Sequence, residues 1–289
     1  MRRTRTKVPR TQKGSATKQR STQTKATVFL GGGRITGALI AGLRLAGYDG
    51  RIIVHDRNPG KLRALRRESG IEVAVDLKSA VAQAEILIVA VRPLAVAEML
   101  NEVARSGAIR KPTLAVSVAA GIPIKKLRAW LGPPVHWARA MPSPVSRIGR
   151  GLTAVTFDRQ VPKHDRNRVR EFFARVGPVL KIPESRFDAF SAAYSPSHGY
   201  HALATLVQAA QNAGLDRNTA LTVAAHAFGD ALVYWKESGL SVAGLLQESA
   251  TPGGTSAAMM EAMKKSGYEK AMAAGLKAAI HRARQNARH

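Results

Sequence analysis

The sequence of 289 residues has no cysteine, few aromatic residues and no long apolar run, and each absence excludes a class of structure or function. Without cysteine there is no disulfide, no thiolate catalysis and no cysteine-ligated metal site, and a reducing compartment fits. The longest apolar run, Ile86 to Val91, has the length of a buried strand and not of a membrane-spanning helix. Aromatic residues form 5% of the chain, which leaves few platforms for stacking single-stranded nucleic acid. We therefore expect a soluble, cytoplasmic protein.

Acidic residues are also scarce, since 19 Asp and Glu stand against 45 Lys and Arg and the net charge is +26. Residues 1–25 hold nine of the basic residues and no acidic one, are rich in Thr, Ser and Gln, and show no apolar periodicity. Such a segment cannot bury a core, so we expect a disordered basic tail. A solvated extension, a polyanion-binding arm and a transit-peptide-like segment all fit this composition. Contact with nucleic acid is expected only nonspecifically, through this tail.

A glycine cluster that follows an apolar run is the most informative feature of the chain. It reads Val28-Phe29-Leu30-Gly31-Gly32-Gly33-Arg34-Ile35-Thr36-Gly37 and continues into an Ala/Leu-rich helical pattern. This order is typical of a dinucleotide-binding turn, in which Gly31 permits the tight turn and Gly33 lets the backbone approach a pyrophosphate. The N–H groups that begin the helix, at Arg34 and Ile35, then face the anion. The third position of the G-x-G-x-x-G pattern is Thr36, so helix and strand must accommodate a larger side chain there.

A second strand-like run, from Arg51 to Asp56, completes a βαβ unit and ends in an acidic residue. We expect Asp56, Arg57 and Asn58 at the adenosine ribose of a nicotinamide cofactor. Asp56 favours an unphosphorylated ribose, whereas Arg57 favours a 2′-phosphate, so NADPH is the expected cofactor and NADH the alternative. The alternative is that the Arg57 side chain is only solvated at the end of the strand and has no role in cofactor binding.

Strand and helix patterns continue to alternate after this unit, as in a parallel sheet covered on both faces. Strands are expected at Ile71–Val75, Ile86–Val91, Thr113–Val118, Val135–Arg139 and Leu152–Phe157, and helices at Leu77–Gln83, Leu94–Arg105 and Ile124–Trp130. Past Pro183 the chain becomes Ala-rich and helical, over Phe187–Tyr194, Gly199–Gly214, Arg217–Gly239, Thr255–Ser266 and Tyr268–Asn286. The predicted fold is therefore α/β: a tail (1–25), an NAD(P)-binding Rossmann domain (26–182) and a helical domain (183–289), whose apolar positions can pack within the domain or against a partner chain.

Three loops carry further candidate site residues. Ala90-Val91-Arg92-Pro93 follows a buried strand at the edge where parallel sheets bind ligands, so these residues join the predicted cofactor site, although Pro93 also suits an ordinary helix start. Paired prolines in Arg139-Ala140-Met141-Pro142-Ser143-Pro144 hold Ser143 in an extended conformation. In Thr251-Pro252-Gly253-Gly254-Thr255-Ser256, hydroxyls precede a helix whose N-terminus suits an anionic or imine substrate, unless Thr255 or Ser256 only caps that helix.

The histidines are scattered, so no metal site is expected. His198 is a weaker candidate site residue, because it lies in the loop Tyr194-Ser195-Pro196-Ser197-His198-Gly199-Tyr200, and a structural role is the safer interpretation.

Taken in order, these segments resemble the pyrroline-5-carboxylate reductase family from about residue 27 to residue 287. The resemblance rests on the glycine cluster with Ala38-Leu39-Ile40-Ala41-Gly42-Leu43, on Ala90-Val91-Arg92-Pro93, Ser117-Val118-Ala119-Ala120-Gly121-Ile122 and Arg139-Ala140-Met141-Pro142, and above all on Thr251-Pro252-Gly253-Gly254-Thr255-Ser256. It implies hydride transfer from NADPH to 1-pyrroline-5-carboxylate, giving L-proline, in a homodimer or larger oligomer with the active site at the junction of two chains. It also implies that the Ser256 hydroxyl contacts the imine nitrogen, with Thr251, Thr255 and Ser143 nearby.

Two substrate-facing loops depart from the family pattern. Ser143-Pro144-Val145 stands where the family carries Asn-Thr-Pro, and Tyr194 to Tyr200 keeps only the closing tyrosine of Ser-Gly-Ser-Gly-Pro-Ala-Tyr. A reductase of a different cyclic imine therefore stays an alternative. A nucleic-acid-binding protein on a Rossmann scaffold is the alternative suggested by the charge.

Overall fold

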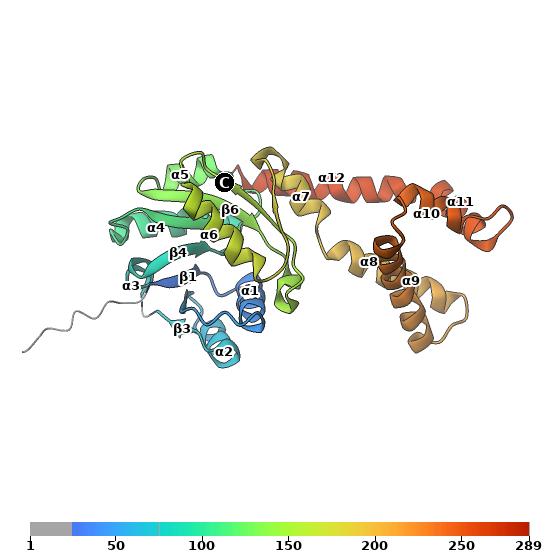
Figure 1. The fold of residues 1–289 in the computed structure, drawn as a ribbon, viewed down its shortest axis with the longest axis horizontal. Coiled ribbons are helices and arrows are strands. Elements are labelled where there is room, and N and C mark those ends of the chain that lie inside the picture. Colours follow the sequence, from blue (N-terminus) through green and yellow to red (C-terminus); the bar gives the residue numbers. More distant parts are fainter. Residues whose placement is uncertain (1–24, 75, 289) are drawn as a thin grey trace, which may run out of the picture.

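The computed structural model describes residues 25–74 and 76–288, so the predicted basic tail lies outside the described residues except for Lys25. The described chain consists of an α/β part and a helical arm that extends from it (Figure 1). Within the described residues, no helix is both long enough and apolar enough to cross a membrane.

A single eight-stranded sheet with the order β3-β2-β1-β4-β5-β6-β7-β8 organises the α/β part. Its strands are β1 (Ala26–Leu30), β2 (Ile52–His55), β3 (Glu72–Val73), β4 (Ala84–Val89), β5 (Thr113–Ser117), β6 (Val135–Met141), β7 (Thr153–Phe157) and β8 (Val179–Lys181). The chain moves outward from β1 to β3 and then returns to place β4 on the other side of β1. This reversal creates a crevice at the carboxyl ends of β1 and β4, where open α/β sheets bind their ligands.

The sheet is not parallel throughout, although the strand pattern predicted a parallel sheet. The strands β1 to β6 pair in parallel, whereas β7 runs antiparallel to β6, with Ala140 opposite Val155. The connection between β6 and β7 contains only the short 3₁₀ helix η2 (Pro144–Ile148) and no crossover helix. Parallel neighbours are usually joined by a crossover helix, and without one the chain returns along β6 in the opposite direction.

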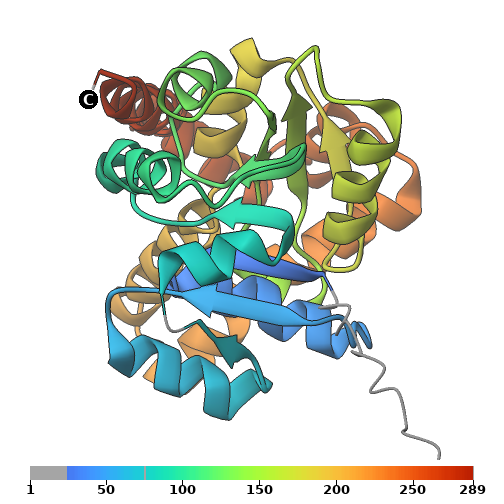
Figure 2. The same cartoon turned by 90° about the vertical axis from the view of Figure 1, so that its left-hand side faces the viewer.

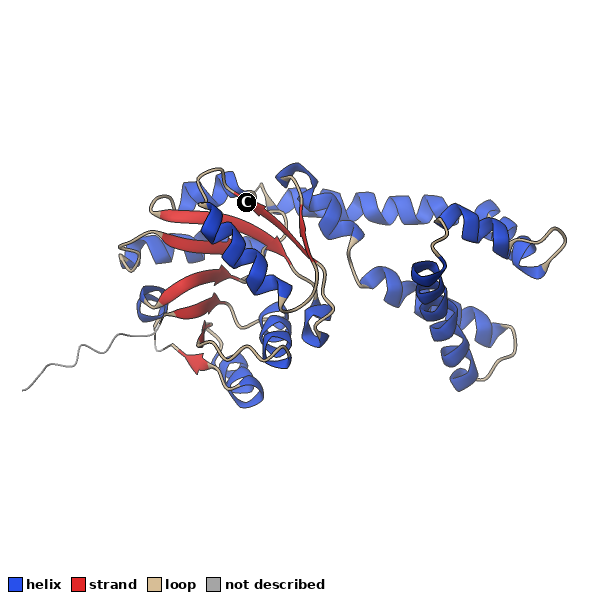
Figure 3. Ribbon diagram, in the orientation of Figure 1, coloured by secondary structure: helices blue, strands red, loops and turns tan. Residues whose placement is uncertain are grey.

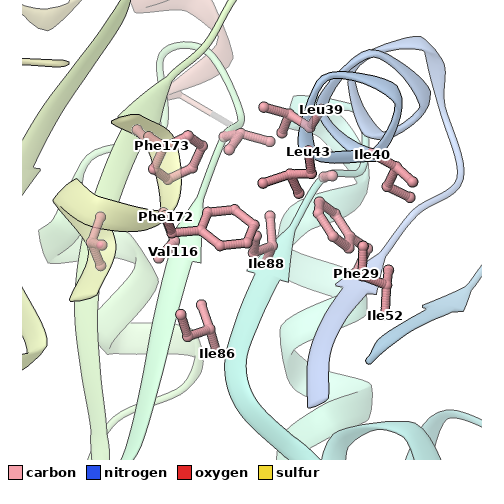
Figure 4. Close-up of a cluster of buried hydrophobic side chains, with 14 of the residues drawn as sticks. Phe29, Leu39, Ile40, Leu43, Ile52, Ile86, Ile88, Val116, Phe172 and Phe173 are labelled. Atoms are coloured by element: carbon pink, nitrogen blue, oxygen red, sulfur yellow. The ribbon is translucent and has the colours of Figure 1, made fainter. Parts of the chain in front are cut away.

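Helices cover both faces of the sheet, as Figures 1 and 2 show. One face carries α1 (Arg34–Leu45), α2 (Pro59–Ser69) and α6 (Lys163–Ala174), and the other carries α3 (Leu77–Ala82), α4 (Val96–Ser106) and α5 (Ile124–Trp130). Figure 4 shows the first of these cores, where Phe29 and Ile88 of the sheet lie beneath Leu43 of α1 and Phe172 of α6. Because both faces are buried, the central strands β1 and β4 are mostly apolar, with Thr27 and Glu85 as exceptions near their amino ends.

Several elements differ from the predicted ones. The edge strand β3 is shorter than Ile71–Val75, with both of its residues exposed, and Val75 lies outside the described residues. The sequence pattern does not predict α2, α6, β8 or the arm helix α10 (Val242–Ser249). In α2 only Leu62 and Leu65 are buried, and in α10 no residue is, so their apolar spacing carries little signal.

The arm contains helices only (Figure 3) and has almost no core of its own. It consists of α7 (Phe187–Ala193), α8 (Ser197–Asn212), α9 (Arg217–Ser238), α10, α11 (Thr255–Lys265) and α12 (Tyr268–Asn286), and follows the 3₁₀ helix η3 (Glu184–Arg186). In α9 only Ala220 and Ala224 are buried, while Leu232 is 60% and Trp235 42% exposed. Apolar surface of this extent, left uncovered in one chain, marks an interaction surface.

The arm is attached to the sheet at two places. Arg139 in β6 is buried, pairs with Glu184 of η3 at 3.0 Å and lies over the ring of Phe187 in α7. The C-terminal end of α12 returns to the loop after β5, beside α5 (Figure 2), where the Asn286 side chain donates to the Ala120 carbonyl at 3.3 Å. The next residue, Gly121, has φ +80°, and a Cβ there would overlap the Ala283 carbonyl oxygen of α12.

This contact predicts that Gly121→Ala destabilises the protein more than the same substitution at a glycine that also has a positive φ but has open space around it. Gly47 is the matched control, because it has φ +72° and a Cβ added there would meet nothing within 4 Å. We expect Gly47→Ala to lower the free energy of unfolding by about 1 kcal/mol and Gly121→Ala by about 3 kcal/mol, since the overlap with α12 adds to the strain. Urea unfolding of both variants measures the difference. Equal losses would show that α12 shifts to accommodate the added methyl group without a further loss of stability.

Candidate active site

The glycine turn brings the ends of β1 and β4 into contact. Gly31 has φ +107°, and a Cβ at this position would lie 2.7 Å from the Ala90 carbonyl oxygen at the end of β4. The Ala90 N–H donates to the Leu30 carbonyl at 2.8 Å. The positive φ and the close Ala90 carbonyl oxygen both exclude a side chain at this position. The predicted role of Gly31 in the tight turn is therefore confirmed.

Thr36 fits the third position of the motif through a specific hydrogen bond. Its side chain is fully buried, and its hydroxyl donates to the Gly31 carbonyl at 2.6 Å. The larger side chain at this position thus fastens the first turn of α1 to the glycine turn instead of separating helix and strand.

The N-terminus of α1 has the features of an anion site. Gly33 is the N-cap, and no side chain caps the helix. A Cβ on Gly33 would meet nothing within 4 Å, so the space in front of the helix is open. The N–H groups of the first turn, at Arg34 and Ile35, and the positive end of the helix dipole therefore face this space. These residues fit the pyrophosphate of a dinucleotide.

Asp56, just beyond β2, holds the glycine turn in place. Its carboxylate accepts hydrogen bonds from the N–H groups of Gly32 and Asn58, both at 2.7 Å, and pairs with Lys61 at 3.4 Å. Burial raises the pKa of this carboxyl, but the two backbone hydrogen bonds and the Lys61 charge lower it by more, so the pKa of Asp56 lies below its usual value. Asp56 therefore stays ionised at neutral pH.

The two residues after Asp56 already have partners within the protein. The Asn58 side chain caps α2 by accepting from the N–H groups of Gly60 and Lys61. The Arg57 guanidinium donates through Nη2 to Glu98 at 2.9 Å and to Glu102 at 3.0 Å, both on α4. These two glutamates were not predicted as site residues, although their spacing of four residues places them on one face of a predicted helix.

The segment Ala90 to Pro93 lies beside the glycine turn, at the same edge of the sheet. Val91 is partly buried, and Arg92 is in extended conformation at the N-cap of the 3₁₀ helix η1 (Pro93–Ala95). Pro93 occupies the first position of η1, which is also what the alternative of an ordinary helix start predicts. The four residues thus follow the carboxyl end of β4, directly beside the glycine turn.

Ser143 lies at the carboxyl end of β6, on the same edge of the sheet as the glycine turn. It is buried and extended, with φ −122° and ψ 156°, as the flanking prolines predicted. Its hydroxyl accepts from the Val145 N–H at 3.2 Å and so caps η2.

The hydroxyls of Thr251, Thr255 and Ser256 lie together where α11 begins. Gly254 is the N-cap of α11, with no side-chain cap, so the alternative in which Thr255 or Ser256 caps the helix is wrong. The Thr251 carbonyl accepts from the Gly254 N–H at 2.9 Å, and none of the three hydroxyls has a hydrogen-bond partner within the described part of the chain. In one chain this loop lies at the end of the arm away from the glycine turn and Ser143 (Figure 1).

His198 makes a contact within the fold, as the structural interpretation of this residue expects. Its Nε2 lies 2.9 Å from the Ala192 carbonyl oxygen, which ties the start of α8 to α7, and Tyr200 is 66% exposed. Across residues 25–74 and 76–288, no group of three or more His, Asp or Glu side chains could hold a metal ion.

The lowered pKa of Asp56 predicts a pH-dependent contribution to stability. A carboxyl whose pKa is depressed in the folded state stabilises the protein above its unfolded pKa, about 3.9, and loses that contribution as the pH falls through the folded value. Asp56→Asn should lower the free energy of unfolding by about 1 to 3 kcal/mol at pH 7, and the difference from the unsubstituted protein should shrink below about pH 4. Urea unfolding from pH 7 to pH 3 measures this.

The exposed Asp49, to which no described residue donates a hydrogen bond, provides the control for that experiment. Asp49→Asn should change the free energy of unfolding by less than about 0.5 kcal/mol at pH 7. A loss in Asp56→Asn that stays constant down to pH 3 would contradict the assignment of the effect to the carboxylate charge.

Known protein families match both the α/β part and the helical arm of this chain. The family model described as NADP oxidoreductase coenzyme F420-dependent matches residues 27–121, and the one described as pyrroline-5-carboxylate reductase dimerisation matches residues 184–286. The chain is 31% identical to a pyrroline-5-carboxylate reductase of Corynebacterium melassecola over 266 residues, which cover 90% of this chain and 98% of that relative.

Solved structures share the fold over almost the whole chain. The structure of Plasmodium falciparum pyrroline carboxylate reductase with NADP bound superimposes with a TM-score of 0.82 at 19% identity, covering 92% of this chain and 99% of that one. A pyrroline-5-carboxylate reductase from Coxiella burnetii gives a TM-score of 0.79 at 25% identity, with 91% and 98% covered. The predicted fold class and resemblance are confirmed, and the chain belongs to the pyrroline-5-carboxylate reductase family.

Proposed function

We propose that this protein reduces 1-pyrroline-5-carboxylate to L-proline with NAD(P)H as hydride donor. The observation that carries the proposal is a pair of helix N-termini that directly follow consecutive glycines and have a glycine as the N-cap. One begins α1 and suits a dinucleotide pyrophosphate, and the other begins α11 among three hydroxyls that have no hydrogen-bond partner among the described residues. Relatives named pyrroline-5-carboxylate reductase align along the whole length that contains both.

Residues 26–182 form the proposed cofactor domain. Gly31 and Gly33 keep the turn open, and the first N–H groups of α1 bind the pyrophosphate. Asp56, Arg57 and Asn58 lie at the ribose end of the crevice, and Ala90 to Pro93 form the opposite wall. When bound, the cofactor supplies a hydride to the imine carbon.

Residues 183–289 form the proposed dimerisation and substrate domain. The first N–H groups of α11 and its dipole neutralise the substrate carboxylate, and the hydroxyls of Thr251, Thr255 and Ser256 orient the imine nitrogen. Ser143 lies on the cofactor side of the same pocket. An imine that enters already protonated needs alignment and charge stabilisation rather than a strong base, and these residues provide both.

The proposed active site combines two chains. In a single chain, the α11 hydroxyls lie at the end of the arm away from the glycine turn (Figure 1). The exposed apolar residues of α9 give the arm a surface for a second copy, which then brings its own α11 to the first chain's sheet. We therefore propose a cytoplasmic homodimer or a larger homo-oligomer built from such pairs.

A reductase of a different cyclic imine is the second candidate, because the altered loops at Ser143 and Tyr194 to Tyr200 face the substrate. A panel of cyclic imines assayed with NADPH and with NADH separates the two candidates. Activity on other imines without activity on pyrroline-5-carboxylate would favour the second one, and oxidation of neither cofactor with any imine would reject both.

The first prediction from this proposal concerns Ser256. Ser256→Ala should lower kcat/KM for the imine by about fivefold to tenfold, since one oriented hydrogen bond of about 1 kcal/mol or slightly more is lost. NADPH affinity should barely change. Ser249→Ala is the matched control, because this nearby hydroxyl donates only to the Leu245 carbonyl within α10. If both variants kept full activity, the hydroxyl would have no role in binding the imine.

A second prediction tests whether the site combines two chains. Gly33→Asp places a negative charge at the cofactor's anion site without steric overlap, since nothing lies within 4 Å of its Cβ position. Co-expressed with Ser256→Ala in equal amounts, it should give mixed pairs in which one of the two sites has both wild-type parts, restoring about a quarter of the wild-type activity. Steady-state kinetics of the purified mixture measures this. If the two variants only averaged their separate activities, Ser256 would act on the cofactor domain of its own chain.

A further inference from the structure

The ion pairs of Arg57 bridge the crevice at its ribose end. Arg57 lies two residues beyond the carboxyl end of β2, and Glu98 and Glu102 lie in the first two turns of α4, which follows β4. Because β1 lies between β2 and β4, a contact from Arg57 to α4 crosses the carboxyl end of β1. The glycine turn begins at this same place, so the bridge spans the position where the adenosine of a dinucleotide binds.

The bridge occupies the nitrogen of Arg57 that a phosphate needs most. Both glutamates accept from Nη2, and no other described residue pairs with the guanidinium. A guanidinium can grip a phosphate at two points along the edge Nε–Nη2 or the edge Nη1–Nη2, and both edges contain Nη2. A two-point grip on a 2′-phosphate therefore requires Arg57 to release at least one glutamate.

An unphosphorylated ribose meets no such requirement. Asp56 uses Oδ1 for the Asn58 N–H and Oδ2 for the Gly32 N–H and Lys61, so Oδ1 keeps a free acceptor position for a ribose hydroxyl. The bridge thus distinguishes between the two forms of the cofactor. It also places two carboxylates near the position of the added phosphate, whose negative charge they repel.

We propose that Glu98 and Glu102 determine cofactor specificity, by holding Arg57 across the crevice and lowering the affinity for a nucleotide with a 2′-phosphate. This rests on the proposed function only in taking a nicotinamide dinucleotide as the ligand. The Arg57 and Glu98 side chains are each 61% exposed and Glu102 40%, so the pairs are weak enough to exchange. Arg57 then contributes to NADPH binding, and the two glutamates reduce the difference in affinity between NADPH and NADH.

Binding of two nucleotide fragments tests this without any hydride transfer. Adenosine 2′,5′-bisphosphate carries the added phosphate and 5′-AMP lacks it, and titration calorimetry measures the Kd of both. The double variant Glu98→Gln with Glu102→Gln should bind the bisphosphate about fivefold to tenfold more tightly than the unsubstituted protein. Its Kd for 5′-AMP should stay within about twofold.

Two further variants make the result specific. Glu72→Gln removes a surface ion pair, with Arg51 at 2.7 Å, at the amino ends of β2 and β3, the opposite end of these strands from Arg57, and it should change neither Kd. Adding Arg57→Ala to the double variant should abolish most of the gain, because the glutamates act chiefly through this guanidinium.

Three results would overturn the inference: weaker bisphosphate binding in the double variant, an equal gain for both fragments, or a full gain that persists without Arg57. Failure of the imine assay would reject the proposed function but leave this binding experiment unaffected. If neither fragment bound to the unsubstituted protein, the cofactor site itself would be rejected, and this inference with it.

Discussion

The approach of the β1 and β4 carboxyl ends at Gly31 is the constraint on which the rest of the α/β part depends. Only a residue without a side chain can combine φ +107° with an Ala90 carbonyl oxygen 2.7 Å from its Cβ position. The Thr36 hydroxyl fastens α1 to this turn, and Asp56 fastens it to the end of β2. Three strands and α1, the helix proposed to bind the pyrophosphate, are thereby fixed around a single glycine.

The helical arm depends on a different constraint, which is the lack of a core. Its helices leave Leu232, Val233, Tyr234 and Trp235 largely exposed, and the described part of one chain does not cover them. Burying such a surface is the main favourable contribution to association. The same geometry keeps the α11 hydroxyls away from the glycine turn of their own chain. Association and completion of the proposed site therefore follow from one arrangement.

Charge has a local role in this chain that its total does not reveal. The net charge of +26 suggests polyanion binding, yet the proposed site uses few side-chain cations. In the proposed site, the N-termini of α1 and α11 bind the anionic groups, and Arg57, at the proposed ribose position, pairs with two glutamates. Backbone N–H groups offer fixed geometry without the desolvation of a charged side chain, which suits ligands that must bind and leave in each turnover.

Much of the fold could be predicted from local sequence. The glycine turn, β1, α1 and β2, the buried strands and most of the arm helices follow from apolar periodicity and from residues whose conformational limits act within a few positions. Asp56, Ser143 and Thr251 to Ser256 were likewise located at the ends of elements. Elements with sparse apolar spacing, such as α2 with only two buried residues, left no comparable signal.

Tertiary structure decided what depends on contacts distant along the chain. The short connection after β6 reverses β7, Gly121 admits the end of α12 from more than 160 residues away, and Arg57 finds partners more than 40 residues further on. The sequence by itself thus determined which residues can turn, cap and bind, because those properties reside in single residues and their neighbours. Packing alone decided which of these residues come into contact within one chain and which need a second chain. The reason is that burial and charge pairing exist only once the chain has folded.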